Sequence, residues 1–121
     1  SRRKFPRYLI STNGSLSARL HYINVPLKLF TFGQGGCSFL GLDPELNLVP
    51  PQTVRFTVEY GEHSASSLRK EIDGSLIYVR PHNPTMKMMF GFRFEPNQVN
   101  EMLPFVTELE DLNKRGLVDR A

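Results

Sequence analysis

Apolar and polar residues alternate through the first three quarters of the chain, and this pattern predicts β-strands. The clearest case is 54–60, where every second residue is apolar, as in a strand with one buried face. Weaker alternation or short apolar runs predict five further strands. These expected strands cover 16–22, 27–32, 37–42, 75–80 and 87–94.

Glycine and proline clusters separate these runs and predict the turns. Gly33-Gln34-Gly35-Gly36 predicts a tight turn, because glycine adopts backbone conformations that strain other residues. Asp73-Gly74 predicts a second hairpin turn, just before the run at 75–80. Strands joined by short turns of this kind form antiparallel sheets.

Beyond residue 94 the apolar spacing changes from that of a strand to that of a helix. Met102, Val106 and Leu109 fall on one face and predict a helix at about 99–115, with Pro104 in its first turn and Gly116 at its end. The chain therefore predicts a small six-stranded antiparallel β-barrel with a C-terminal α-helix packed on it.

The 121-residue length corresponds to a single domain, which buries roughly two thirds of its unfolded surface. We expect a basic arm or linker at 1–10 and the barrel with its helix at 11–121. One cysteine and three scattered histidines exclude an intramolecular disulfide and argue against a zinc site or other cofactor. No apolar run approaches the ~18 residues of a membrane span, and the opening residues do not have the pattern of a signal peptide, so we expect a cytoplasmic domain.

Charge is distributed unevenly along the chain. Residues 1–42 contain six Lys and Arg and no acid, whereas 43–121 contain the other nine cations and all twelve acids. This asymmetry indicates a local attraction for anions, and a compact anion such as a nucleotide fits it better than a long nucleic acid.

Four of the first seven residues are cationic. Because Pro6 fixes its own φ and disfavours helix at Phe5, this segment is expected to be an extended arm. The forked guanidinium groups of Arg3 and Arg7 suit phosphate oxygens and guanine edges. A solvated, frayed terminus is the competing interpretation.

Catalytic chemistry has little support in the sequence. No nucleophile and base are placed together, and Cys37 falls in an apolar strand, where a buried structural thiol is the usual role. The glycine turn leads into another strand, which excludes the Rossmann and P-loop motifs because both lead into a helix.

In their order along the chain, the Arg3-x-x-x-Arg7 arm, the glycine turn and the strands ending in a helix resemble a PilZ domain over nearly the full length. The resemblance implies a six-stranded barrel with a C-terminal helix that binds cyclic di-GMP. In that family an Arg-x-x-x-Arg arm wraps over the nucleotide, which here implies roles for Arg3 and Arg7, with Arg2 as an additional arginine.

The family's second motif, Asp/Asn-x-Ser-x-x-Gly, is incomplete. With the glycine turn aligned, Thr31 replaces the acid or amide, Gly33 replaces the serine and Gly36 matches. A shifted frame from Gly36 to Gly41 keeps Ser38, but places it inside the apolar strand. Neither frame contains a carboxylate, and losing one acceptor for the guanine edge is expected to weaken binding by about ten- to a hundredfold.

Three functions remain open from the sequence. The first is a cyclic di-GMP receptor that transmits its signal by conformational change to another protein or a neighbouring domain. The second is an interaction module that binds no nucleotide. A small barrel that binds RNA or single-stranded DNA is disfavoured, because Phe90, Phe92 and Phe94 share a face expected in the core and the basic charge is confined to one end.

Overall fold

The structure is a computed structural model that describes residues 4–10, 16–21, 28–41, 49–61, 68–82 and 87–121. It contains one antiparallel sheet in the strand order β1-β3-β4-β7-β6-β5-β2. The strands are β1 (Arg7–Leu9), β2 (Leu16–Leu20), β3 (Lys28–Gly33), β4 (Gly36–Gly41), β5 (Gln52–Tyr60), β6 (Leu68–His82) and β7 (Lys87–Phe94). A 3₁₀ helix, η1 (Pro96–Met102), leads directly into the helix α1 (Leu103–Lys114).

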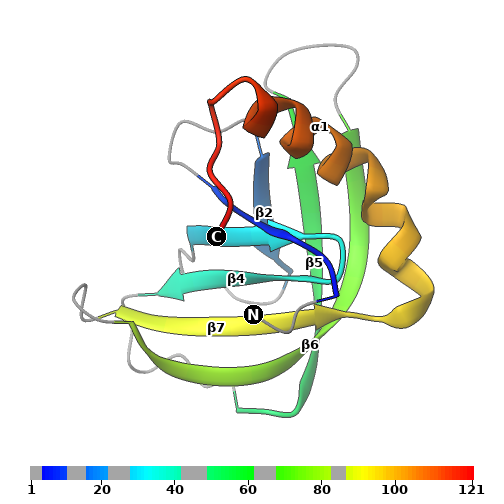
Figure 1. Cartoon of the computed structure of the whole chain (residues 1–121). Helices are drawn as coiled ribbons and strands as arrows, with labels where there is room; N and C mark the ends of the chain where they lie inside the picture. Colours follow the sequence, from blue (N-terminus) through cyan, green and yellow to red (C-terminus); the bar gives the residue numbers. More distant parts are fainter. Residues whose placement is uncertain (1–3, 11–15, 22–27, 42–48, 62–67, 83–86) are drawn as a thin grey trace.

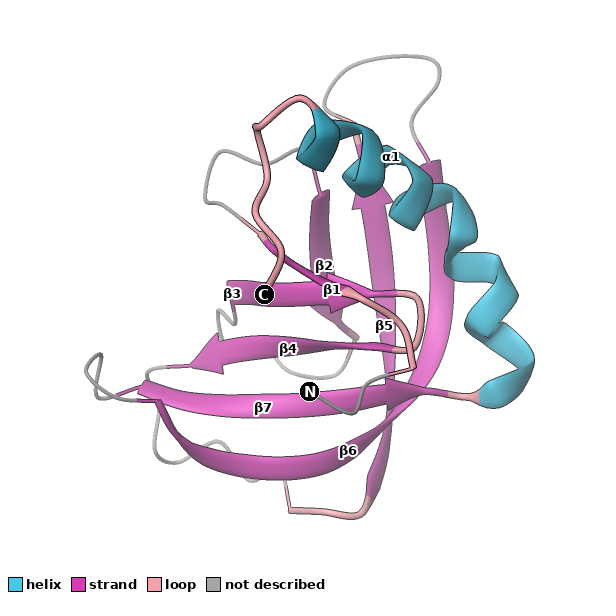
Figure 2. Cartoon of the chain, in the orientation of Figure 1, coloured by secondary structure: helices cyan, strands magenta, loops and turns pink. Residues whose placement is uncertain are grey.

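The sheet curls strongly, and α1 lies across one end of it (Figure 1, Figure 2). This arrangement confirms the predicted fold class, a mainly antiparallel, barrel-like β-sheet with a single C-terminal helix. The sheet has seven strands in place of the expected six, because residues 7–9 of the predicted arm form β1. None of the helices in the described part of the chain is long and apolar enough to span a bilayer.

Aromatic rings fill the inside of the curl. The Phe56 and Phe92 rings lie 5.2 Å apart at nearly right angles, and the Phe39 ring packs edge-on against Phe92 at 5.7 Å. From the helix, Phe105 reaches the same core and contacts Phe32. Edge-to-face pairs of this kind add to the stabilisation that burial of the rings provides.

The helix agrees closely with its sequence pattern. Phe105, Val106 and Leu109 are buried, and Pro104 occupies the first turn of α1, where its missing N–H breaks no hydrogen bond. The predicted helix at about 99–115 begins as the 3₁₀ segment at Pro96. Gly116 ends it with a φ of 75°, in the left-handed region that glycine adopts without strain.

The predicted hairpin turn at Asp73-Gly74 is wrong. These residues lie within the continuous 15-residue strand β6, where Gly74 pairs with Val54 on one side and Phe94 on the other. A Cβ atom on Gly74 would lie 2.7 Å from Cζ of Phe56. The ring of Phe56 fills the space that a side chain at position 74 would need. The glycine is therefore explained by this packing and not by a turn.

Strand β1 is held on both of its edges. On one edge it pairs with β3, and on the other it meets the C-terminal tail, which we define as residues 118–121. The amide of Leu9 donates to the carbonyl of Asp119 at 2.8 Å, and the amide of Ala121 donates to the carbonyl of Arg7 at 2.9 Å. The two ends of the described chain therefore lie side by side (Figure 1).

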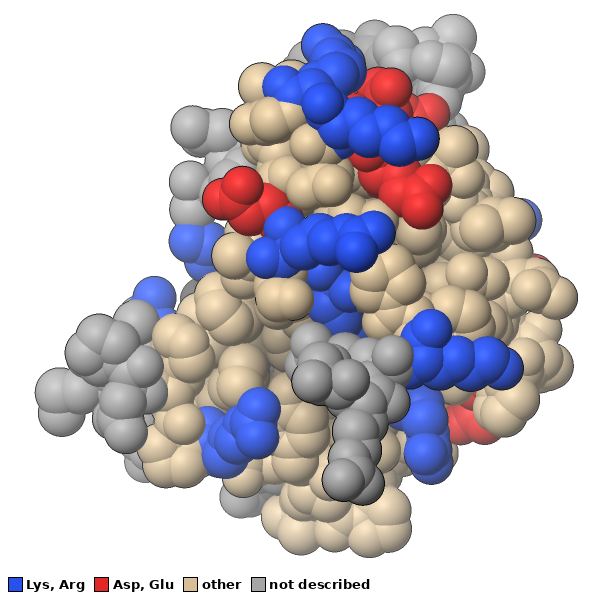
Figure 3. Space-filling model, in the orientation of Figure 1, with Lys and Arg blue, Asp and Glu red and all other residues tan. Residues whose placement is uncertain are grey.

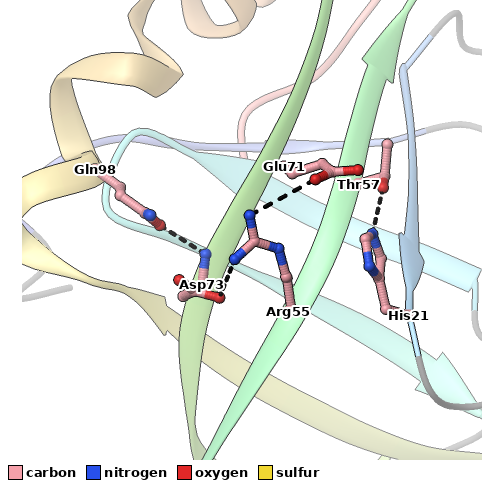
Figure 4. Close-up of polar contacts among 6 residues, drawn as sticks. All are labelled: His21, Arg55, Thr57, Glu71, Asp73 and Gln98. Atoms are coloured by element: carbon pink, nitrogen blue, oxygen red, sulfur yellow. Dashed lines mark hydrogen bonds and ion pairs between the residues drawn. The ribbon is translucent and has the colours of Figure 1, made fainter.

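Charged side chains cross the outer face of β5 and β6 (Figure 4). Arg55 lies 3.6 Å from a carboxylate oxygen of Glu71 and 3.5 Å from one of Asp73. Exposed pairs such as these contribute about 0–1 kcal/mol each. The side-chain carbonyl of Gln98 accepts a hydrogen bond from the amide of Asp73 at 2.6 Å, which ties η1 to β6.

The thiol of Cys37 is completely buried on β4, as the apolar pattern predicted. Burial raises the pKa of Cys37 to about 12 from its ordinary value of 9.0, although the positive charge of Arg7 opposes the shift. The thiol is therefore neutral at physiological pH, which suits a packing role.

Replacing Gly74 with Ala tests the close contact with Phe56. We expect Gly74→Ala to lower the free energy of unfolding by about 1–3 kcal/mol, because the added methyl group must displace the ring, and urea denaturation measures this. Ile77→Ala, at an exposed position of the same strand, is the matched control, with an expected change of about 0.5 kcal/mol. Equal stability of Gly74→Ala and the parent would contradict the packing described above.

Burial of Cys37 also predicts a pH dependence of stability. Below pH 9 the thiol is protonated in both states, but above it the unfolded chain loses the proton while the folded protein retains it. The free energy of unfolding should therefore fall between about pH 9 and 12, with a contribution of at most about 1.4 kcal/mol per pH unit from this group.

The Cys37→Ala variant isolates this effect from the titration of other groups, and the measurement is chemical denaturation at a series of pH values. If Cys37→Ala is less stable than the parent below pH 9, the difference between their unfolding free energies should shrink as the pH rises from 9 to 12. A difference that stays constant from pH 9 to 12 would show that the folded thiol ionises normally.

Candidate functional site

A pocket of about 390 Å³ opens where the N-terminal arm crosses the sheet. This volume is within the range of about 300–1,000 Å³ typical of small-molecule sites. Its walls come from the arm, the β3–β4 turn, the middle of β6, the end of β7 and η1. The lining residues are Lys4, Phe5, Arg7, Gly35, Ile77, Tyr78, Arg93, Phe94, Pro96 and Val99.

The pocket combines apolar walls with positive charge. Of the lining residues that the structure describes, Lys4, Arg7 and Arg93 are cationic and none is Asp or Glu. Lys and Arg side chains also spread over the face on which the N-terminal arm lies (Figure 3). An anion with a flat or apolar body matches this combination of charge and surface.

The glycines of the β3–β4 turn provide space for the arm. A Cβ atom on Gly33 would collide with the carbonyl oxygen of Pro6 and lie 2.9 Å from Cδ of Arg7. One on Gly35 would lie 2.9 Å from Cδ2 of Phe5. The tight turn was predicted correctly, but its physical reason differs from the expectation. These glycines have no positive φ; they are required because the arm packs directly on them.

Gly36 also leaves space for the arm, in this case for the side chain of Arg7. A Cβ atom there would lie 2.6 Å from Nη2 of Arg7 and would also collide with the carbonyl oxygen of Phe92. The guanidinium group therefore lies over Gly36, at the edge of the pocket. Three residues singled out from the sequence, Arg7, Gly33 and Gly36, come together in this way.

Thr31 positions Arg7 through its hydroxyl group. Nη1 of Arg7 donates a hydrogen bond to Oγ1 of Thr31 at 3.2 Å, and that oxygen shares a second hydrogen bond of 2.6 Å with Oγ of Ser38. Only 5% of Thr31 and 1% of Ser38 is exposed. Thr31 and Ser38 pair with each other on β3 and β4 and lie beneath the Arg7 guanidinium. They are also the two residues that distinguish the two alignments of the second motif.

Tyr78 and Ile77 form the wall contributed by β6. The strand register shifts between Leu76 and Tyr78, and this irregularity leaves Ile77 46% exposed. The Tyr78 ring covers Gly91 so closely that a Cβ there would collide with it, and the guanidinium carbon of Arg80 lies 4.4 Å from the ring centroid. A cation stacked on an aromatic face in this way stabilises the ring position.

The sequence predictions for the site divide into three groups. The structure brings together Arg7, Thr31, Gly33 and Gly36, whereas Arg2 and Arg3 lie outside the described residues. Arg93 lines the pocket and was not anticipated. Its signal was the alternation of β7, in which buried Phe92 and Phe94 leave Arg93 on the outer face.

No protein-family model matches the sequence, and no curated protein sequence matches it. Solved structures do match its fold. The Bacillus subtilis inhibitor of motility, MotI/DgrA, superposes with a TM-score of 0.70 at 15% identity, over 95% of this chain and 54% of that one. The PilZ domain of Escherichia coli YcgR with c-di-GMP gives a TM-score of 0.67 at 14% identity, over 96% of this chain and 97% of that one.

A structure of E. coli YcgR in complex with c-di-GMP matches with a TM-score of 0.69 at 15% identity. The match covers 96% of this chain but only 49% of the YcgR chain. The match to MotI/DgrA likewise covers about half of that protein. The shared region therefore covers nearly all of this chain. The fold of this chain is that of a PilZ domain.

Proposed function

We propose that this domain is a non-catalytic bacterial receptor for cyclic di-GMP, acting in the cytoplasm and binding the nucleotide in the pocket beneath the arm. One observation carries the proposal: Lys4, Arg7 and Arg93 line an otherwise apolar pocket, and none of the other described residues around it is an acid. The same fold is present in YcgR structures that contain c-di-GMP. A nucleotide combines the anionic phosphates and the flat bases that such a pocket suits.

Arg7 is the central residue of the proposed site. Its guanidinium is planar and carries paired donors, so it can bind two phosphate oxygens or the edge of a guanine. The hydrogen bond to Thr31 orients it before any ligand arrives, which lowers the entropic cost of binding. Arg2 and Arg3, which precede the described part of the arm, are proposed to close over the nucleotide from the same side.

Thr31 affects the expected affinity. In the PilZ motif the corresponding position is an acid or amide that meets the guanine, but here a buried hydroxyl group is occupied by Ser38 and Arg7. We therefore expect binding through Arg7, the other cations and the apolar wall, about ten- to a hundredfold weaker than with a carboxylate present.

Strand β1 connects the pocket to the C-terminal tail. Arg7 contributes its side chain to the pocket, and its backbone carbonyl accepts the hydrogen bond of Ala121. A nucleotide that fixes Arg7 would therefore also fix the arm relative to the C-terminal tail. A neighbouring domain or a partner protein that reads the position of the arm would then respond to the nucleotide.

Titration calorimetry with cyclic di-GMP tests the proposal directly. We expect the parent domain to bind and Arg7→Ala to bind at least about tenfold more weakly, because a charge-assisted hydrogen bond is lost. Arg55→Ala, on the outer face of β5, is the control and should bind like the parent. No heat at high micromolar nucleotide, or equal affinity of the parent and Arg7→Ala, would refute the proposal.

A second candidate is an interaction module that binds no nucleotide, and the environment of Thr31 favours it. The hydroxyl groups of Thr31 and Ser38 are buried and bonded to each other, so this position offers no carboxylate or amide to a guanine edge. The Thr31→Asp variant separates the two functions. Restoring the motif serine at Gly33 as well is unsuitable, because its Cβ would collide with the arm at Pro6.

If the module hypothesis is correct, the parent shows no heat with cyclic di-GMP, and Thr31→Asp gains binding by supplying the missing carboxylate. If the receptor hypothesis is correct, the parent already binds. Thr31→Ser, which keeps a hydroxyl group, is the matched control and should behave like the parent in both cases. The third function, binding of RNA or single-stranded DNA, loses its stacking platform because Phe90, Phe92 and Phe94 are all buried.

A further inference from the structure

Arg93 is a cationic residue on β7 that neither PilZ motif contains. We propose that it is the second arginine of the pocket and that, together with Arg7, it holds one phosphate group of the ligand between two guanidinium groups. The inference rests on the proposed function, which it extends by naming the residue that binds opposite the arm.

The sheet register brings the two arginines together. Arg93 pairs with Gly36 on β4, and Gly36 is the residue over which the Arg7 guanidinium lies. A Cβ atom built on Gly36 would be 2.6 Å from Nη2 of Arg7 and 3.3 Å from Cα of Arg93. The guanidinium of Arg7 is therefore close to the backbone of Arg93, and both side chains line the same pocket.

None of the described residues places a carboxylate within 4 Å of Arg93, which is also the case for Arg19, Arg80 and Arg120. Glu95, two residues further along the chain, accepts a hydrogen bond from the hydroxyl of Ser75 at 3.0 Å. Two cationic side chains that line one apolar pocket attract an anion to the space between them.

A phosphodiester suits this arrangement because it has two non-bridging oxygens. Each guanidinium can donate to one of them, and the apolar walls reduce the competition from water. Lysine could not provide the same geometry, since its ammonium group is a point charge without the planar fork of arginine. The pair Arg7 and Arg93 therefore suits one phosphodiester group held between the two guanidinium groups.

The test is titration calorimetry with cyclic di-GMP on the parent chain, Arg93→Gln, Arg93→Lys and Arg69→Gln. Arg69 is an exposed arginine of β6 paired with Glu59, so its variant makes the same charge change away from the pocket. We expect Arg93→Gln to bind about ten- to a hundredfold more weakly and Arg93→Lys to fall between it and the parent. Arg69→Gln should stay within about twofold, as expected for a screened exposed charge.

The outcomes separate this inference from the proposed function. If the parent and Arg7→Ala behave as proposed but Arg93→Gln binds within twofold of the parent, the role of Arg93 is refuted and the receptor function stands. Because Arg93 is exposed, its variants should retain the parent's thermal melting temperature, which is measured on each sample. A weaker affinity accompanied by a lowered melting temperature in Arg93→Gln but not in Arg93→Lys would count against a direct contact.

If the parent binds no cyclic di-GMP, the proposed function fails, and the pair of arginines is tested with inorganic pyrophosphate. The readout is the side-chain Nε–Hε resonances of Arg7 and Arg93 in a ¹⁵N-labelled chain. Both resonances shifting together, with Arg69 unchanged, supports a phosphate held by the pair. A shift of neither resonance, or of Arg7 alone, overturns the inference.

Discussion

The close approach of the N-terminal arm to the β3–β4 turn is the constraint on which the site depends. Because Gly33, Gly35 and Gly36 have no side chains, the backbone at Pro6, the ring of Phe5 and the guanidinium of Arg7 can pack directly on the turn. The pocket exists because the arm lies there, since Lys4, Phe5 and Arg7 form one of its walls. Arm and turn, far apart in the sequence, thus act as a single structural unit.

Alternation and helical spacing predicted most of the fold, because both patterns report which face of an element is buried. Local signals failed where a distant residue decides the structure. Asp73-Gly74 has the composition of a hairpin turn, but the ring of Phe56 takes the space beside Gly74 and keeps β6 continuous. The irregularity that exposes Ile77 likewise has no counterpart in the pattern of its own segment.

Which residues lie together around the pocket could be anticipated where short motifs describe them, but not where the register of the sheet decides. Arg7, Thr31, Gly33 and Gly36 were anticipated because they belong to two compact stretches of sequence. Arg93 joins them only through its pairing with Gly36. The surroundings of Thr31 also depend on the fold, because its hydroxyl group is buried and bonded to both Arg7 and Ser38.

The pairing of β1 with the C-terminal tail has a consequence for the order in which the protein opens. Leu9 and Asp119 are separated by almost the entire chain, so their hydrogen bond closes a very long loop and carries a larger entropic cost than a local contact. A short ladder at the end of a structure is also among the first parts to exchange its amide protons. The contacts that place the arm over the pocket are therefore expected to open first, while the core around Phe56 and Phe92 stays folded.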